Sequence, residues 1–135
     1  MITFNESIIG KEESRLLGEA IAKSSIAQGP YVEKFEKLFS SYCGTKHAAA
    51  CFNGTVALHL ALCALGIKEG DEVIVPSFTF VGTANAAAFI KAKPVFTDIK
   101  KDTLCINPES IERKITKKTK AIIPVHVYGN VCDMG

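Results

Sequence analysis

Apolar and polar residues follow one another along this chain in blocks whose spacing predicts alternating helices and strands. Apolar side chains recur at helical spacing in two early segments, while a later segment is apolar almost throughout and another is rich in small residues. A proline followed by acidic residues starts one more short helix. Residues 1–10 are expected to be an extended lead-in. Helices are thus predicted at Lys11–Lys23, Tyr31–Tyr42, Val56–Leu65, Val81–Lys91 and from Pro108.

Four short apolar runs predict strands, at Ala48–Cys51, Glu72–Val75, Pro94–Thr97 and Ala121–Val125. Because each run is apolar throughout and the runs alternate with helices, they predict an α/β fold with a mostly parallel sheet covered on both faces. Ligands in such folds bind at the carboxyl ends of strands. Three loops occupy that position, namely Phe52–Thr55, Ser77–Phe80 and His126–Gly129.

The segment His47–Gly66 suggests an anion site. It reads as a strand, a tight turn at Asn53-Gly54-Thr55 and an apolar helix, so free backbone N–H groups and the positive end of the helix dipole point at one spot. Asn, Gly and Thr are also ordinary residues at the start of a helix, so a purely structural role stays open. The segment matches neither of the two commonest nucleotide-binding loops.

Composition excludes several classes of protein. The 135 residues are 47% hydrophobic and 22% charged, the balance of one folded domain, and the net charge of +2 is too small to indicate nucleic acid or an anionic membrane as a partner. No signal peptide is recognised, and the longest apolar run is too short to cross a bilayer. The five scattered cysteines predict neither disulfides nor a metal site, and they favour a reducing cytoplasm; Cys51 and Cys63 are expected to be buried.

Four sequence segments together carry a family resemblance: GPYVEKFEKLFSSYCGTKHA, NGTVALHLALCALGIKEGDEVIVPSFTFVGTANA, KPVFTDIKKDTLCINPESIERKITKKTKAIIPVHVYG and CDM. In this order and spacing they resemble the N-terminal part of the DegT/StrS nucleotide-sugar aminotransferases, which depend on pyridoxal phosphate (PLP). The resemblance covers essentially the whole chain. It implies the three-layer α/β/α large domain of fold type I, and a homodimer with active sites at the subunit interface. It also implies amino transfer from glutamate or glutamine to a nucleotide-linked keto-sugar, used in surface polysaccharide or amino-sugar biosynthesis.

The resemblance assigns cofactor-side roles. Gly54 and Thr55, preceded by Asn53, match the segment that binds the PLP phosphate, and Phe80 matches the aromatic residue that stacks on the pyridine ring. Ser77, together with Thr79, is a nearby polar candidate. Loop capping by these two hydroxyls and packing by Phe80 are the structural alternatives.

The resemblance also marks residues of lower weight. His126 is expected near the cofactor, although a histidine hydrogen-bonded for structure fits equally well. Gln28 and Gly29 are weak candidates on the substrate side. His59 is interpreted as a fully partnered core histidine, and Asp98 as a structural acid. Two departures from the family pattern, at Ser24-Ser25 and Lys91-Ala92 where glycine is frequent, could each alter a local turn.

Much of the family's catalytic machinery lies outside this sequence. The lysine that forms a Schiff base with PLP, the carboxylate that faces the pyridine nitrogen and the small C-terminal domain all come later in the family. No catalytic residue is therefore expected here, and the chain alone is expected to be inactive. Residues 1–45 would form N-terminal helices with a substrate-entrance loop, and residues 46–135 a strand and helix core. The sheet would have a gap, which predicts association with the missing remainder or dimerisation.

Other readings remain beside the aminotransferase. The chain could be an inactive remnant that serves as an interaction module, or part of a PLP-dependent sugar dehydratase built on the same scaffold. A DNA-binding regulator is not supported, since the sequence has no basic stripe and no helix-turn-helix pattern.

Overall fold

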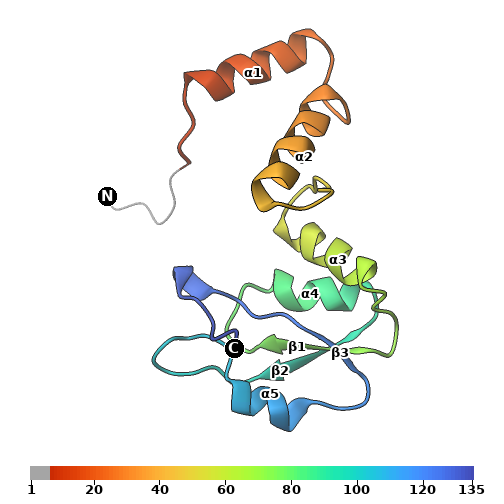
Figure 1. Cartoon of the computed structure of the whole chain (residues 1–135), viewed down its shortest axis with the longest axis vertical. Coiled ribbons are helices and arrows are strands. Elements are labelled where there is room, and N and C mark those ends of the chain that lie inside the picture. The colour runs from red at the N-terminus through yellow and green to blue at the C-terminus, as the bar shows by residue number, and fades with distance from the viewer. Residues whose placement is uncertain (1–6) are drawn as a thin grey trace. The chain divides into compact units, whose positions relative to one another are not determined.

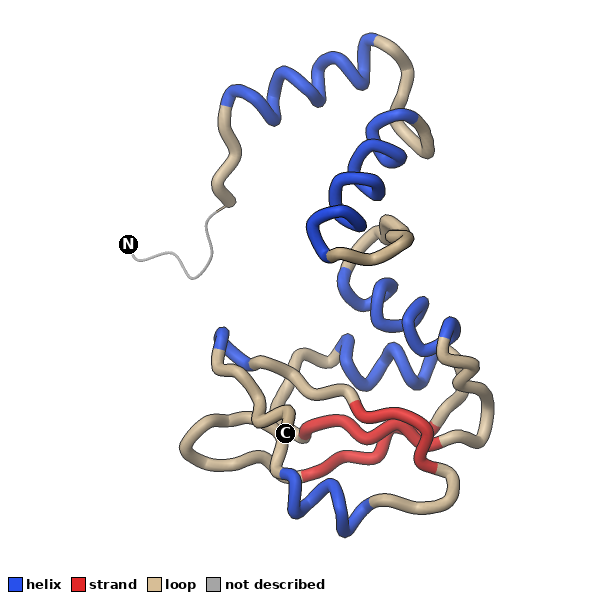
Figure 2. Tube along the Cα trace, in the orientation of Figure 1, coloured by secondary structure: helices blue, strands red, loops and turns tan. Residues whose placement is uncertain are grey.

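The computed structural model describes residues 7–135, which include all of the predicted elements except most of the lead-in. The chain forms two compact units, residues 1–50 and residues 51–135. Figures 1 and 2 trace the elements of both units along the chain. Of the predicted lead-in, residues 1–6 lie outside the described part, and residues 7–10 have no regular structure.

The first unit contains two helices, α1 (Lys11–Ala22) and α2 (Pro30–Cys43), as the apolar spacing predicted. The backbone N–H of Gly10 donates to the Glu13 carboxylate at 2.8 Å, which satisfies one of the free donors at the start of α1. Helix α2 begins with proline at its first position, where the missing N–H is harmless, and ends at Gly44 with φ 66°. Local signals thus fix both ends of α2.

The predicted strand Ala48–Cys51 is wrong, because this segment has no regular structure. The backbone N–H of Ala50 donates to the carboxylate of Glu36 at 2.8 Å, so a side chain of α2 takes the place of a neighbouring strand. The apolar run predicted a buried strand, whereas Ala48, Ala50 and Cys51 are half-buried and Ala49 is exposed. The boundary between the two units falls within this segment.

The second unit is built on a three-stranded sheet of β1 (Glu72–Pro76), β2 (Lys93–Thr97) and β3 (Thr119–Ile122). The strand order is β2-β1-β3 and both pairings are parallel. All five residues of β1 are buried, as expected for a central strand covered on both faces. The predicted α/β fold with a parallel sheet is therefore confirmed.

Helices cover both faces of this sheet. Figures 1 and 2 show α4 on one face and α5 on the other. Helix α3 packs on α4, which in turn contacts the sheet. The bounds of these helices, with a short 3₁₀ helix near the end of the chain, are α3 Gly54–Ala64, α4 Gly82–Phe89, α5 Pro108–Lys114 and η1 Val127–Gly129.

The core is divided by the alternation of side chains along β1. Val73 and Val75 belong to an apolar cluster with residues of α3 and α4, while Ile74 belongs to a second cluster. Successive side chains of a strand point to opposite faces, so the sheet separates two small cores. The buried members of the second cluster are Ile74, Cys105, Ile106 and Cys132.

The expected burial of Cys51 and Cys63 is not what the structure shows, since Cys51 is half-buried and Cys63 is exposed. Cys105 and Cys132 are the buried thiols, and burial raises the pKa of the Cys132 thiol. Cys63 is exposed because α3 has an uncovered face, on which Val56 and Leu60 are 40% and 44% exposed. An apolar helix sequence therefore did not mean a fully buried helix.

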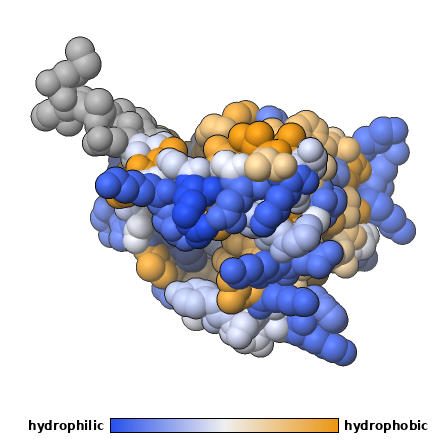
Figure 3. All heavy atoms as spheres, turned by 90° about the horizontal axis from the view of Figure 1, so that it is seen from above, coloured by the Kyte–Doolittle hydropathy of each residue, from blue (hydrophilic) through white to orange (hydrophobic). Residues whose placement is uncertain are grey.

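Hydrophobic side chains are also open elsewhere on the surface. Figure 3 shows orange, hydrophobic residues next to hydrophilic ones on the face it displays. None of the helices described between residues 7 and 135 combines the length and the apolar character needed to cross a membrane.

Candidate functional site

The start of α3 presents unpaired backbone donors. The Asn53 side-chain oxygen accepts a hydrogen bond from the Val56 N–H at 3.0 Å and so caps the helix. The N–H groups of Gly54 and Thr55 have no hydrogen-bond partner within residues 7–135, and neither has the Thr55 hydroxyl. These donors, with the positive end of the helix dipole, form a site suited to an anion.

A cavity of about 660 Å³ lies at this helix start. Its walls come from the start of α3, the beginning of α4 and the loop that follows the carboxyl end of β1. The sequence predicted that side chains would meet at this edge of a parallel sheet, and the structure brings Gly54, Thr55 and Phe80 to one cavity. The lining residues are Asn53, Gly54, Thr55, Ala57, Leu58, Phe80, Gly82 and Thr83.

Gly82 allows the two sides of the cavity to approach closely. A Cβ atom at Gly82 would lie 2.4 Å from the Thr55 hydroxyl oxygen and 2.9 Å from carbon atoms of the Phe80 ring. Both distances are shorter than van der Waals contact, so any larger residue must displace these two groups. The absence of a side chain at Gly82 thus sets the distance between α3 and the Phe80 ring.

Phe80 also forms a wall of a second cavity, of about 430 Å³. Its ring is 75% exposed, so it has little packing to hold it in place in this chain. On the neighbouring residue, the Thr79 hydroxyl lies 2.9 Å from the Thr83 hydroxyl, which ties the loop to α4. The second cavity is lined by Phe78, Thr79, Phe80, Val125, His126, Val127 and Tyr128.

The two remaining candidates on the cofactor side lie further from the first cavity's lining. The N–H of Ser77 donates to the Thr97 carbonyl at 2.8 Å and its exposed side chain lines neither of these cavities. His126 is exposed and lines the second cavity, and its Nδ1 accepts a hydrogen bond from the Cys132 N–H at 3.0 Å. That bond gives the imidazole a structural function in addition to any contact with a ligand.

The weak substrate-side candidates Gln28 and Gly29 lie in the loop between α1 and α2, in the first unit. Asp98 serves the fold: its N–H donates to the Ser110 hydroxyl at 3.1 Å, and its carbonyl accepts from the Asn107 N–H at 3.0 Å. These bonds connect the end of β2 to the start of α5.

The prediction that His59 is fully partnered is wrong. Its Nδ1 is buried and has no hydrogen-bond partner within residues 7–135. Its Nε2 lies 3.7 Å from the Cys63 sulfur, and its ring packs edge-on against Phe89 with centroids 6.0 Å apart. The imidazole is half-buried beside Phe89 of α4, and this apolar neighbour supplies no second polar partner.

Sequence reasoning missed Gly82 and Thr83 as lining residues, together with the Phe78–Tyr128 ring contact at 6.3 Å. Thr79 lies in the loop before α4 and Thr83 in its first turn, so helical spacing could not have indicated their contact. Within residues 7–135, no three histidine, cysteine, aspartate or glutamate side chains gather closely enough to hold a metal ion.

Known proteins are similar to this chain in sequence and in fold. The profile of the DegT/DnrJ/EryC1/StrS aminotransferase family matches residues 7–135. The chain belongs to this family.

Three similar proteins show how far the match extends. The chain is 53% identical over 106 residues to the GDP-perosamine synthase of Caulobacter vibrioides, which covers 78% of this chain and 29% of that protein. It is 44% identical over 135 residues to the GDP-perosamine synthase of Vibrio cholerae, covering 99% of this chain and 37% of the relative. The crystal structure of NtdA from Bacillus subtilis with bound cofactor PMP superposes with a TM-score of 0.85 at 40% identity, over 93% of this chain and 30% of that one. The chain thus spans about a third of the length of these relatives.

Proposed function

We propose that this chain carries the phosphate-binding and ring-stacking part of the PLP site of a nucleotide-sugar aminotransferase. The observation that carries the proposal is the cavity where the free N–H groups of Gly54 and Thr55 face the same space as the Phe80 ring. Family membership and the cofactor-bound NtdA structure support the choice of cofactor.

The residues present fit such a cofactor at two of its ends. Backbone donors at a helix start and the Thr55 hydroxyl suit a phosphate, and the flat apolar side chain of Phe80 suits an aromatic ring. The cavity volume of about 660 Å³ is in the range of small-molecule sites. When bound, PLP supplies an electron sink for the carbon that gains or loses the amino group.

This chain's own residues bind and orient. The start of α3 holds a charged phosphate in place, while Phe80 covers one face of the ring and excludes water from it. Among the described residues, neither of the two cavities is lined by a lysine. The proton transfers of amino transfer therefore need a group that these cavities do not provide, and we propose that the chain alone does not transaminate.

We propose a nucleotide-linked keto-sugar as substrate and glutamate or glutamine as amino donor for the complete enzyme. The two GDP-perosamine synthases among the relatives support a sugar nucleotide. Homodimerisation, or association with the remainder of the enzyme, is part of the same proposal, and the uncovered face of α3 supports it. A cytoplasmic location stays a prediction.

The test is a titration of the purified chain with PLP, with Phe80→Ala and Phe80→Leu as variants. Because Phe80 is 75% exposed, neither substitution should change the fold, which circular dichroism checks. We expect PLP binding that inorganic phosphate competes away, and a loss of roughly 1 kcal/mol, or about fivefold in Kd, in Phe80→Ala. Leucine should be almost as weak as alanine, because it lacks a flat ring.

Borohydride reduction followed by mass spectrometry completes the test. We expect no adduct at a single lysine, since no lysine lines the two cavities. A stoichiometric adduct at one lysine would show that the chain builds a complete site, and binding that phosphate does not compete with would contradict the assignment of the helix start.

A further inference from the structure

A further cavity, distinct from the two described above, lies within the first unit at the junction of α1 and α2. It has a volume of about 460 Å³, which is within the range of small-ligand sites. Its lining combines the end of α1, the loop that follows and the first turns of α2. The lining residues are Lys23, Ser25, Pro30, Tyr31 and Lys34.

The two charged groups of this lining are ammonium groups, which favour an anion. Two side chains carry ammonium groups, two carry hydroxyls, and none carries a carboxylate. Lys34 forms no ion pair within residues 7–135, so its charge is not neutralised by a direct partner. Lys23 has only a distant ion pair, with its Nζ 4.0 Å from the Glu19 carboxylate.

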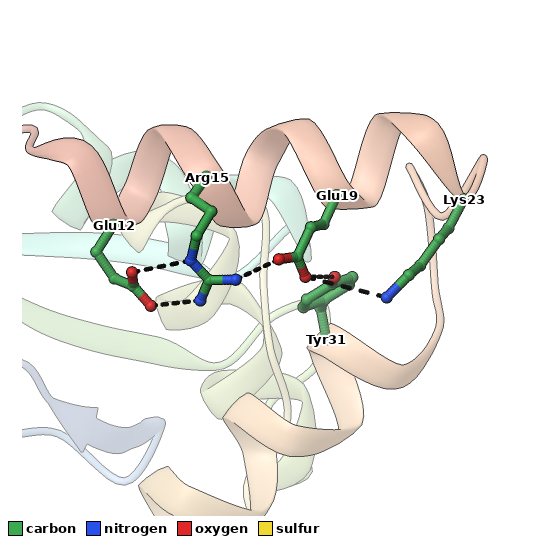
Figure 4. Close-up of polar contacts among 5 residues, drawn as sticks. All are labelled: Glu12, Arg15, Glu19, Lys23 and Tyr31. Atoms are coloured by element: carbon green, nitrogen blue, oxygen red, sulfur yellow. Dashed lines mark hydrogen bonds and ion pairs between the residues drawn. The ribbon is translucent and has the colours of Figure 1, made fainter.

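The carboxylate of Glu19 contacts two residues of the lining, Lys23 and Tyr31, and also pairs with Arg15. Figure 4 shows the polar contacts that run along α1 from Glu12 through Arg15 to Glu19, and from there to Lys23 and to Tyr31 of α2. Arg15 forms an ion pair with Glu19 and another with Glu12 at 2.6 Å. The Tyr31 hydroxyl donates to Glu19 at 3.5 Å, which orients the phenol at the cavity wall. Since Arg15 shares the charge of Glu19, Lys23 and Lys34 leave a net positive potential at the cavity.

The loop keeps the Ser25 hydroxyl close to the backbone. A Cβ atom at Gly29 would lie 3.2 Å from the Ser25 oxygen, tighter than an ordinary contact. A residue with a side chain at Gly29 would therefore crowd this hydroxyl. Glycine here leaves the hydroxyl room beside the first turn of α2.

We propose that this cavity binds a phosphate group of a nucleoside diphosphate. Lysine ammonium groups act as point charges that suit phosphate oxygens, whereas a free carboxylate is best recognised by the planar fork of arginine, which this lining lacks. Every residue that lines this anion site belongs to the first unit. Its assignment to the nucleotide end of the sugar substrate rests on the proposed function.

Titrations of the whole chain with inorganic pyrophosphate and with GDP, followed by amide NMR at constant ionic strength, test the proposal. We expect both anions to shift the amide signals of Ser25 and Tyr31, and guanosine and glutamate to leave them unchanged. Lys34→Gln should weaken binding roughly tenfold, the loss expected for one charge-assisted contact. Lys23→Gln should act in the same direction, so the proposal does not depend on one variant that fails to fold.

Lys37→Gln is the matched control, because it removes the same charge from the same helix outside this lining. It should change binding by less than about twofold, as expected of a screened surface charge. Equal losses in Lys34→Gln and Lys37→Gln would show general attraction by α2 and overturn the proposal. So would shifts confined to other residues, or binding of guanosine as strong as that of GDP.

The outcome is separable from that of the PLP titration. Pyrophosphate binding at Ser25 with no PLP binding at Phe80 would keep the anion site and contradict the proposed function. PLP binding without any pyrophosphate effect at Ser25 would support the proposed function and contradict the anion site.

Discussion

The Thr116 hydroxyl donates a hydrogen bond to the Glu72 carboxylate at 2.6 Å, and so ties the segment before β3 to the first residue of the central strand. This bond is the largest cause that holds the pKa of Glu72 below the ordinary glutamate value of 4.5. Lys93 acts in the same direction from β2, with its Nζ 3.3 Å from the same carboxylate, while burial opposes both. One side chain therefore links all three strands.

This linkage predicts an acid-dependent loss of stability. A carboxylate whose pKa is lowered by folding stabilises the fold at pH values above its unfolded pKa, and that contribution is lost as the pH falls through the folded pKa. Urea unfolding of the wild type should therefore show a midpoint that declines below about pH 4.5. Glu72→Gln should be less stable near neutral pH and should lose less on acidification.

Two variants control this experiment. Thr116→Val removes the donor and should flatten the same part of the pH profile. Glu69→Gln removes a carboxylate that is 74% exposed and forms only a surface ion pair with Lys91, so its profile should follow the wild type. An unchanged profile in Glu72→Gln would contradict the assignment.

Lys91 offers a stabilising substitution. It has φ 56°, the left-handed conformation that costs a residue with a side chain about 1 kcal/mol. Lys91→Gly should raise the free energy of unfolding by up to about 1 kcal/mol, measured with urea. Lys91→Ala also removes the exposed ion pair with Glu69 but keeps the strain, so any gain shared by both variants would point away from the backbone.

Two substitutions at Asn53 distinguish its role in capping α3 from the binding of an anion at the start of that helix. Asn53→Ala removes the acceptor for the Val56 N–H and should lower stability by about 1 kcal/mol. Asn53→Asp keeps an acceptor and adds a negative charge that favours the helix start but repels a phosphate. We expect this variant to unfold like the wild type and to bind PLP more weakly, by titration; PLP binding as tight as that of the wild type would contradict a phosphate site at Gly54 and Thr55.

The sequence predicted what depends on local periodicity and on the order of elements. Helices α1 and α2 and strand β1 follow from apolar spacing. Gly54 and Phe80 were expected together because each was placed after a strand; they do line one cavity, but only Phe80 follows a strand. The false strand at Ala48–Cys51 shows the limit, since pairing depends on a neighbour that a local pattern does not identify.

Close tertiary approach was the part that sequence reasoning could not supply. The role of Gly82 depends on the position of the Thr55 oxygen, on a helix that begins 28 residues earlier in the chain. Cys63 was assigned to the core from the apolar residues around it, but which face of α3 is covered depends on α4. Apolar periodicity predicts that a helix forms, but it does not identify the elements that pack against that helix.

The order of the strands also determines how long the central strand waits for its partners while the chain is being synthesised. The central strand is made first, and its Glu72 contacts Lys93 of one neighbour 21 residues later and Thr116, beside the other, 44 residues later. At about 5–20 residues per second, the first partner follows after roughly 1–4 s and the second after roughly 2–9 s. During that interval the most apolar strand of the sheet has no partner strand, so its backbone edges and apolar side chains are open to contacts with other chains.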